Sequence, residues 1–298
     1  MGRRRRGQPI HGWLILDKPA AMTSARAVAR VLRITGAAKG GHGGTLDPMA
    51  TGVLPVALGE ATKTTAYAMG SAKEYKFTIR WGEARDTDDG DGAVVETSAI
   101  RPEAADIGAA LGAFIGRVTQ VPPAYAAIKI GGERAYDLAR EGRPATMPPR
   151  EVVIESLEMT EIVDRDHARF VMRCGKGTYV RALARDLARR LGTVGHLASL
   201  RRTAVGDYRA ADAISLDKLE TLVHSGALFE HLRPVETALD DIPALAVTDE
   251  QADRLKKGQA VHVLESAPGR VCVAANGRLV ALADVKDGKA RPVRVFNL

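Results

Sequence analysis

The spacing of apolar residues predicts a chain of mixed strands and helices. Residues 75–81 (YKFTIRW) alternate between apolar and polar side chains, and residues 168–174 do the same, which is typical of strands with one buried face. Further strands are expected at 11–16 and 151–159, and helices at 25–34 and 102–116.

Residues 178–191 carry a regular helical pattern. Leucines recur every four residues and should face the core (Leu183, Leu187 and Leu191), while arginines recur likewise on another face (Arg181, Arg185 and Arg189). Thr178 is the expected N-cap and Gly192 the expected stop, and Ser24 is the expected N-cap of the helix at 25–34. A basic stripe on a helix usually faces solvent, so this pattern alone gives the arginines no special role.

The end of the chain reads as a separate, smaller unit. Residues 239–246 are typical of a linker, and Thr248 begins a short helix that stops at Gly258. Strand candidates follow, with hairpin turns expected at 276–277 (Asn-Gly) and 287–288 (Asp-Gly). The pattern predicts a small β-rich module.

Length and charge narrow the class of protein. The chain has 298 residues, enough for one or two domains, a formal net charge of +7 and a pI near 9.5. This balance favours a polyanionic partner but does not distinguish RNA from DNA or a membrane surface. Aromatic residues make up only 4%, which argues against an extensive platform for stacking bases. A basic arm at residues 1–10 is either a non-specific phosphate contact or a solubilising tail.

Several classes of protein are disfavoured. Cys174 and Cys272 stand far apart, so neither a disulfide framework nor a zinc site is indicated. No apolar run reaches the roughly 18 residues of a membrane helix, and the apolar run near the N-terminus is too short for a signal peptide. We expect a cytoplasmic protein with no membrane partner.

Residues 41–63, GHGGTLDPMATGVLPVALGEATK, stand out from the rest of the chain. Asp47 is surrounded by glycines and threonines, and Pro48 pushes it out of the α region onto a bent, extended segment. Gly43 and Gly44 allow backbone or a ligand to approach closely. Asp-Pro and Gly-Gly are also common in surface turns, so the spacing alone leaves both interpretations open.

Residues 84–92, ARDTDDGDG, are crowded with carboxylates. They fail as a calcium loop because Gly90 occupies the fifth position and Thr97 stands in the twelfth, where Glu is required. Calcium binding is excluded on this basis.

The stretch at 41–63 resembles the signature of the TruB-type tRNA pseudouridine synthases, which convert the T-loop uridine of tRNA to pseudouridine. The similarity extends from about Gly12 to the C-terminus through DKPAAMTSA, PPAYAAIKIGGERAYDLAR and GKGTYVRALARDL. It implies an α+β fold with a mixed, largely antiparallel central sheet flanked by helices. The catalytic domain would span 11–240, and a PUA-like RNA-binding domain 247–298, although a stabilising appendage is the alternative for the latter.

The resemblance also assigns the catalytic residues. Asp47 matches the essential catalytic carboxylate, and Arg181 matches the arginine that pairs with it. Tyr75 matches the tyrosine that packs against the target base, although a core tyrosine in a strand is the plain alternative. Lys18-Pro19 resembles a motif whose role is chiefly structural, so it is not assigned to catalysis.

Further residues around the target uridine follow from the same resemblance. His42 matches the residue that fills the vacated base stack, and Tyr179 and Leu200 match residues that line the uracil pocket. Asp89 would belong to the rim of the active site, or alternatively to a plain acidic turn.

The segment 121–150 corresponds to an insertion, often called a thumb, that closes over the RNA. Its expected phosphate contacts are Lys129, Arg134, Arg140 and Arg143. Charges on a surface loop more often serve only solvation, and the resemblance shifts the interpretation towards RNA contact.

The implied reaction breaks the N1–C1′ bond, turns the uracil and rejoins it through C5. It is redox-neutral, so no cofactor and no metal are expected. The carboxylate could attack C1′, add to C6 or remove the C2′ proton. The expected partner is the T-arm stem-loop of tRNA, bound by a monomer without a guide RNA because no long basic tail is present. Two alternatives stay open: a tRNA-binding or tRNA-folding protein with incidental catalysis, and a glycoside-type hydrolase, which normally needs two carboxylates.

Overall fold

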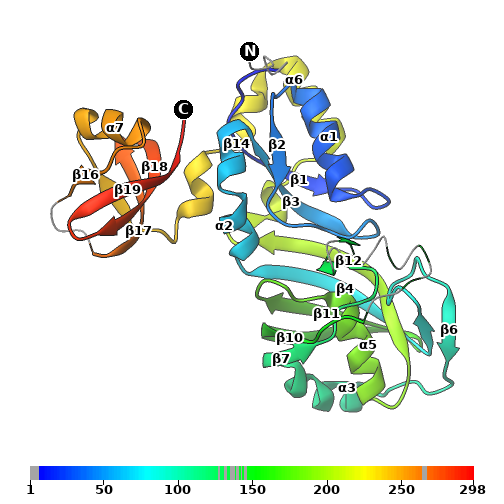
Figure 1. Ribbon diagram of the computed structural model, residues 1–298. Helices are drawn as coiled ribbons and strands as arrows, with labels where there is room; N and C mark the ends of the chain where they lie inside the picture. The colour runs from blue at the N-terminus through cyan, green and yellow to red at the C-terminus, as the bar shows by residue number, and fades with distance from the viewer. Residues whose placement is uncertain are drawn as a thin grey trace.

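The computed structural model describes residues 7–126, 128–130, 133–134, 138, 141, 143, 146–263 and 267–298. Figure 1 shows a large unit built on one long sheet and a smaller C-terminal unit beside it. Within the described ranges, no helix is both long and apolar enough to cross a membrane.

The central sheet has ten strands and confirms the expected α+β fold. Its main path runs through β14 (Leu232–Arg233), β1 (Gly12–Lys18), β3 (Thr51–Leu58), β12 (Gly195–Val205), β4 (Lys73–Trp81), β11 (His167–Cys174), β10 (Arg150–Asp164) and β7 (Gly116–Gln120). Off this path, β2 (Gly40–His42) pairs with β3, and β13 (Tyr208–Arg209) pairs with β12. Only the pairing of β12 with β3 is parallel, so the sheet is mixed and largely antiparallel.

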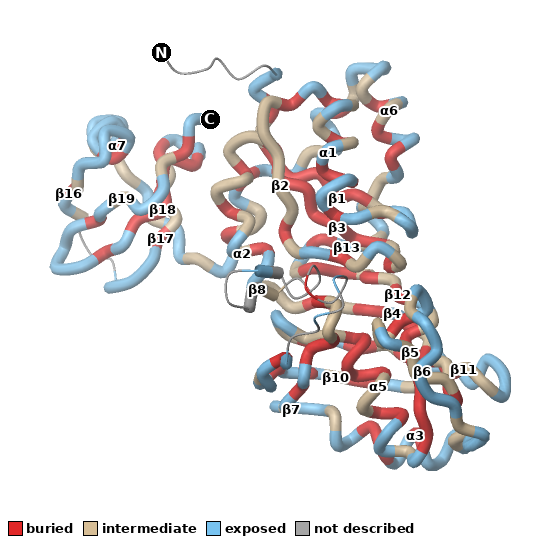
Figure 2. The backbone as a smooth tube through the Cα atoms, turned by 45° about the vertical axis from the view of Figure 1, so that its right-hand side comes forward, coloured by how far each residue is buried: buried red, intermediate tan, exposed pale blue. Residues whose placement is uncertain are grey.

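Helices cover the sheet in two places. The helix α1 (Ser24–Thr35) and the helix α6 (Leu216–Ser225) pack against β1 and β3, whereas α3 (Ala104–Leu111) and α5 (Val180–Arg190) lie over β4, β11 and β12. The short helix α2 (Thr65–Gly70) follows β3. Figure 2 shows buried residues concentrated in the central strands and on α5.

Two elements project from the large unit. The short strands β5 (Glu83–Arg85) and β6 (Val94–Thr97) form a hairpin that contains the acidic segment. The strands β8 (Lys129–Ile130) and β9 (Glu133–Arg134) pair within the insertion.

The face of α5 that carries the arginines is more buried than the sequence pattern predicts. Leu183 and Leu187 are buried as predicted. The arginine stripe, however, is graded from inside to outside: the side chain of Arg181 is 5% exposed, that of Arg185 is 14% exposed, and Arg189 is exposed. Only the last of the three therefore fits a solvated basic face.

The helix ends also differ from expectation. The N-cap of α1 is Thr23, whose hydroxyl accepts from the N–H of Arg26, so Ser24 is not the cap. The N-cap of α5 is Tyr179, without a side-chain cap, because the hydroxyl of Thr178 donates to the carbonyl of Gly175. The expected helix at 102–116 is shorter, ending at Leu111 before a 3-10 turn.

The smaller unit is a five-stranded sheet in the order β15 (Ala244–Ala246), β17 (Gly269–Ala275), β18 (Arg278–Lys286), β19 (Lys289–Val295) and β16 (Val261–His262), with α7 (Asp249–Lys256) packed on it. Asn276 and Gly277 have φ values of 50° and 73°, the left-handed conformation that a tight hairpin turn requires. The expected linker at 239–246 is wrong in its second half, because residues 244–246 pair with β17.

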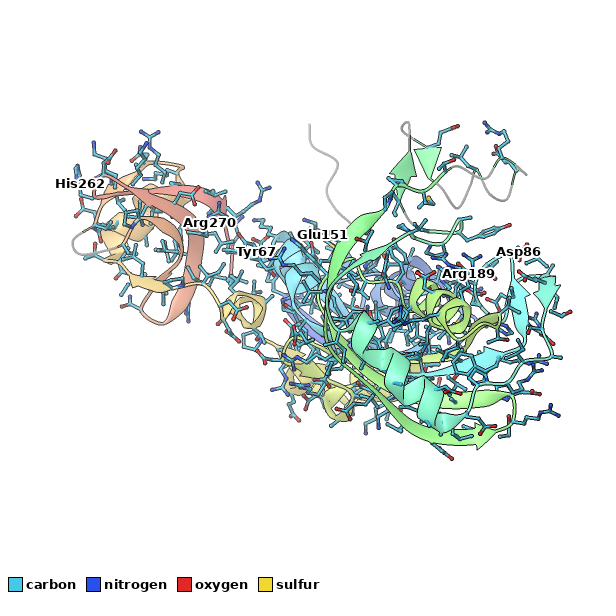
Figure 3. The ribbon with its side chains drawn as sticks, turned by 90° about the horizontal axis from the view of Figure 1, so that it is seen from below. Tyr67, Asp86, Glu151, Arg189, His262 and Arg270 are labelled. Atoms are coloured by element: carbon cyan, nitrogen blue, oxygen red, sulfur yellow. The ribbon has the colours of Figure 1, made fainter. Side chains whose placement is uncertain are left out.

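The two units are in contact. Lys63 donates to the carbonyl of Val295 at 2.6 Å, and Arg270 donates to the hydroxyl of Tyr67 at 2.7 Å. Figure 3 labels Tyr67 and Arg270 at this junction, where Phe296 also joins an apolar cluster of the large unit.

Candidate active site

Asp47 and Arg181 meet at the start of α5. Asp47 lies in the irregular segment between β2 and β3, as expected from Pro48, and its side chain is 30% exposed. The Nε of Arg181 donates to one carboxylate oxygen at 3.0 Å, and Nη2 donates to the other at 3.1 Å. This is a bidentate ion pair between a buried cation and a partly accessible carboxylate.

The remaining N–H groups of Arg181 also have acceptors. Nη1 donates to the carbonyl of Thr87 at 3.0 Å, and Nη2 donates to the carbonyl of Tyr125 at 3.0 Å. Nη1 also lies 3.5 Å from Asp89. The guanidinium therefore joins α5 to the Asp47 segment, the acidic loop and the beginning of the insertion.

A second buried arginine holds the Asp47 segment from the side of the sheet. Arg202 on β12 is 1% exposed, and its three nitrogens donate to the carbonyls of Val53, Thr45 and Gly44 at 2.8, 3.1 and 3.1 Å. Gly44 has a φ of 134°, which favours glycine. The irregular backbone before Asp47 thus satisfies its carbonyls with a buried cation.

Two further side chains fix the same segment. The hydroxyl of Ser24 accepts from the N–H of Leu46 at 2.8 Å and donates to its carbonyl at 3.0 Å. Lys18 is fully buried, and its Nζ donates to the carbonyl of Pro48 at 3.3 Å. Burial lowers the pKa of Lys18 to about 8, and the charge of Asp47 opposes this shift. The contact agrees with a chiefly structural role for Lys18.

Tyr75 and Leu200 lie together in the core beside this segment. Tyr75 is 8% and Leu200 is 7% exposed, and both belong to a cluster that contains Leu46. Burial raises the pKa of Tyr75, which keeps the phenol neutral, while Arg202 opposes this effect.

Tyr179 is held differently. The buried side chain of Gln120 donates to the carbonyl of Tyr179 at 3.3 Å and accepts from its N–H at 3.1 Å. The guanidinium of Arg150 lies 5.5 Å from the centre of the Tyr179 ring. This ring packs with a small cluster that contains Ala126 and Met147, next to the insertion.

Asp89 is buried and His42 is half-buried. Asp89 is 5% exposed and accepts from the hydroxyl of Thr87 at 2.6 Å and from the N–H of Asp91 at 3.1 Å. Asp89 is therefore a buried carboxylate and not a solvated acidic turn, and this burial raises its pKa. His42 is half-buried on β2, and burial lowers the pKa of its ring, with Arg202 acting in the same direction.

Of the four residues expected to contact phosphates, Arg143 is the one whose side chain belongs to the described part of the chain. Lys129 and Arg134 are directly opposite each other in the β8–β9 pair, but their side chains lie outside the described part. Arg140 also lies outside it. Arg143 is exposed and pairs with Glu141.

The sequence interpretation missed several of these residues. The period-two pattern of β12 places Arg202 on the same face as Leu200, which was the available signal that this arginine points inwards. Gln120 and the carbonyls of Thr87 and Tyr125 carry no comparable signal. In the described ranges, no group of three or more His, Cys, Asp or Glu side chains is placed to hold a metal ion.

A hollow of about 830 Å³ borders the site but does not include Asp47. It lies mainly on the face of β4, β11 and β12 that α3 and α5 do not cover, with Lys76, Arg169 and Arg201 in its lining. It reaches the site at Met49 and Leu200 and borders the acidic loop at Gly90 and Asp91. The candidate active site is therefore defined by its hydrogen bonds and charges, not by the shape of this hollow.

Comparisons with known proteins identify the family of the chain. Residues 32–180 match the family described as "TruB family pseudouridylate synthase (N terminal domain)", and residues 181–240 match the "tRNA pseudouridylate synthase B C-terminal domain". The chain is 53% identical to "tRNA pseudouridine synthase B" of Caulobacter vibrioides, with 100% of both chains covered. It is 49% identical to the protein of the same name from Rhodospirillum rubrum, again over both full lengths.

Solved structures show the same fold. One is the "Crystal Structure of a Cbf5-Nop10-Gar1 Complex", with a TM-score of 0.72 and 25% identity over 96% of this chain and 84% of that chain. An archaeal box H/ACA Nop10-Cbf5 complex gives a TM-score of 0.73 at 23% identity, over 100% of this chain and 92% of that one. With these matches, the chain belongs to the TruB family of pseudouridylate synthases and is an isomerase.

Proposed function

We propose that this enzyme converts the T-loop uridine of tRNA to pseudouridine, with Asp47 as the catalytic carboxylate. The observation that carries the proposal is the bidentate pair of Asp47 and Arg181, which presents a partly accessible carboxylate against a buried cation. The names of the full-length curated relatives support tRNA as the substrate.

The reaction needs a carboxylate held in one orientation while the uracil leaves C1′, turns and returns through C5. Arg181 fixes the plane of the carboxylate and supplies its counter-charge. The three ways in which Asp47 could act, at C1′, at C6 or at the C2′ proton, all need a charged carboxylate, for which Arg181 is the counter-ion.

The residues around Asp47 suit a base that has left its stack. Tyr75 and Leu200 form an apolar wall beside the Asp47 segment, on which a uracil ring can pack. The ring of Tyr179 lies between Arg150 and the beginning of the insertion, where it can contact a base or its ribose. Because a stacked base is inaccessible to Asp47, the uridine must be flipped out at a cost of a few kcal/mol.

His42 and Asp89 take supporting roles in this proposal. A His42 ring with a lowered pKa is neutral near pH 7 and can occupy the space that the flipped base leaves. Asp89 lies near the other side of Arg181 and completes its charge environment. The insertion would close over the T-arm through phosphate contacts at Lys129, Arg134, Arg140 and Arg143.

We further propose that the enzyme works in the cytoplasm as a monomer without a guide RNA. The curated relatives that are covered over their full length are named "tRNA pseudouridine synthase B", a name that supports tRNA as the substrate. The small C-terminal sheet, with its basic residues, would serve as the PUA-like RNA-binding domain.

The test is a conversion assay with unmodified tRNA and purified protein, without added cofactor and with excess EDTA. Wild-type protein should form pseudouridine in the T-loop, and Asp47→Asn should form none while its tRNA affinity stays within about threefold, because the change removes charge but little volume. Residual turnover above about one per cent would move the catalytic role away from Asp47. An inactive wild-type protein that still binds tRNA would favour a tRNA-binding or tRNA-folding role.

A further inference from the structure

Arg185 stands one turn beyond Arg181 on α5 and makes a second set of contacts to the same neighbours. Its Nη1 donates to the carboxylate of Asp88 at 2.8 Å, and its Nη2 donates to the carbonyl of Val121 at 2.8 Å. Its Nε donates to the adjacent Asp186 at 2.8 Å. A side chain that is 14% exposed and has acceptors on all three nitrogens is not arranged to bind a phosphate.

The two arginines connect α5 to the same pair of segments. In the acidic loop, Arg181 binds the carbonyl of Thr87 and Arg185 binds the next residue, Asp88. At the beginning of the insertion, Arg185 binds Val121, and Arg181 binds Tyr125 four residues later. Arg185 does not need to touch Asp47 to influence it, because it holds the backbone from which Arg181 takes its acceptors.

Asp88 is held in the acidic loop by its backbone and by its side chain. Its φ is 60°, a left-handed conformation that is uncommon for residues with a Cβ, although aspartate adopts it more readily than most. Its carbonyl accepts from the N–H of Leu197 at 3.1 Å, and its carboxylate is held by Arg185. Burial raises the pKa of Asp88 and Arg185 opposes that shift, so loss of the arginine would leave a poorly solvated carboxylate that favours moving out.

The start of the insertion is fixed at one more point. Gln120 pairs with both the N–H and the carbonyl of Tyr179, the residue that precedes α5. The segment 120–125 is thus tied to α5 at its beginning by Gln120, then by Arg185 and finally by Arg181. A shift of this segment would change the acceptor geometry around Arg181.

We propose that Arg185, paired with Asp88, is a positioning residue that keeps the acidic loop and the start of the insertion aligned with the Asp47–Arg181 pair. This inference rests on the proposed function, because the alignment matters only if Asp47 and Arg181 carry the reaction. It predicts an effect on the chemical step and not on tRNA binding. A phosphate-contacting arginine would show the opposite behaviour.

The matched control is Arg189, the next residue of the same stripe. It is exposed, and Figure 3 labels it on α5. Arg189→Met and Arg185→Met remove the same charge from the same helix face, one turn apart. Any difference between them therefore reports the contacts of Arg185 and not the net charge of α5.

The experiment measures single-turnover rates at saturating tRNA, tRNA affinity over a range of salt concentrations, and thermal unfolding. Arg185→Met should slow the single-turnover rate by about ten- to a hundredfold, as small misplacements at active sites do. Its tRNA affinity should stay within about threefold, and its salt slope should equal that of wild type. Arg189→Met should leave the rate unchanged.

Two more variants keep the test decisive if Arg185→Met folds poorly. Arg185→Lys can reach Asp88 or Val121 but not both, so it should recover only part of the rate. Asp88→Asn keeps the volume and removes the charge, and should slow the rate as well. If the pair acts as a unit, Asp88→Asn combined with Arg185→Met should be no slower than Arg185→Met alone.

The inference is overturned if Arg185→Met weakens tRNA binding and lowers the salt slope by about 1 while the saturated rate is unchanged, since that is the behaviour of a phosphate contact. Equal rates for the Arg185 and Arg189 variants would overturn it too. These outcomes are distinct from failure of the proposed function, in which the wild-type protein itself forms no pseudouridine.

Discussion

Replacement of Arg181 by lysine tests the central ion pair most directly. The guanidinium makes two hydrogen bonds to the carboxylate of Asp47 and two to the carbonyls of Thr87 and Tyr125, with Asp89 also close. Lysine keeps the positive charge but has three rotating donors at one point and no planar fork. It cannot reach both oxygens of Asp47 and both carbonyls at once.

The magnitude follows from the bonds that are lost. A hydrogen bond to a charged group contributes about 1.5 to 3 kcal/mol. Loss of one of the two bonds to Asp47, together with reorientation of its carboxylate, should cost about 2 to 3 kcal/mol in the transition state. This corresponds to a rate loss of about 30- to 150-fold. Arg181→Met should be slower still, because it leaves Asp47 and Asp89 without their shared cation.

Both variants should also lose stability. Arg181 is 4% exposed and does not belong to the leucine core of α5, so the contacts that it makes are polar and at least partly buried. Removal of its donors leaves the part-buried carbonyl of Thr87 without this hydrogen bond, at a cost of about 1 to 3 kcal/mol. Activity must therefore be compared among folded proteins, with circular dichroism and urea unfolding as checks.

The assay is single-turnover conversion of unmodified tRNA at saturating enzyme, with tRNA affinity measured separately. Arg189→Met is the control for loss of one positive charge on α5. A folded Arg181→Lys variant that keeps its rate within about threefold of wild type would refute the reasoning. So would an Arg181→Met variant whose defect is confined to tRNA affinity and its salt dependence.

Three other substitutions test how the Asp47 segment is held. In Arg202→Lys, a single ammonium group replaces the three nitrogens that donate to three carbonyls. We expect single-turnover conversion to be at least about tenfold slower and the urea midpoint to be lower. An unchanged rate would show that the position of Asp47 does not depend on Arg202. Gly52→Ala should lower the free energy of unfolding, measured in urea, by about 3 kcal/mol or more. The φ of Gly52 is 102°, and a Cβ at this position would lie 2.2 Å from the carbonyl oxygen of Arg202. A loss under about 1 kcal/mol would contradict this geometry. Relative to Lys18→Met, the wild-type protein should gain stability as the pH rises from 8 to 10.5, by at most about 1.4 kcal/mol per pH unit. The reason is that the folded protein releases the Lys18 proton near pH 8, whereas the unfolded chain keeps it up to about pH 10.5. If the difference in unfolding free energy between the two proteins does not change with pH, the pKa of Lys18 is that of an ordinary lysine.

The periodic part of this fold was predictable from the sequence. The alternation at 75–81 and 168–174 gave two central strands, and the four-residue leucine repeat gave the buried face of α5. Asn276-Gly277 gave a hairpin turn at the expected place. In each case one local rule, either a period or a turn conformation, decides the outcome without help from distant residues.

The N-caps of α1 and α5 were not predictable in this way, although Thr248 caps α7 at the expected place. Ser24 and Thr178 are good capping residues by type, but each hydroxyl is used elsewhere. Ser24 pairs with both backbone groups of Leu46, a contact between residues that are 22 positions apart. A local preference loses here to a tertiary hydrogen bond.

The candidate site also combines a feature that the local sequence decides with one that depends on a distant residue. The bent backbone at Asp47 followed from Pro48 alone. The partner of Asp47 did not, because Arg181 is 134 positions away and belongs to a stripe whose ordinary meaning is a solvated face. Only the resemblance to a known family pointed to that residue, and the structure places the two side chains in contact.

The same physical requirement explains why arginines recur at this site. The segments that meet there, at Asp47, in the acidic loop and at the start of the insertion, are irregular, so their carbonyls have no partners in a regular ladder. A buried guanidinium has five N–H donors and needs an acceptor for each of them. Arg181, Arg185 and Arg202 each donate to at least one carbonyl of these segments, so backbone acceptors and these buried or partly buried cations satisfy one another. The backbone around Asp47 thus has side-chain hydrogen bonds where strand pairing is absent, and these bonds let a carboxylate on a loop keep one orientation.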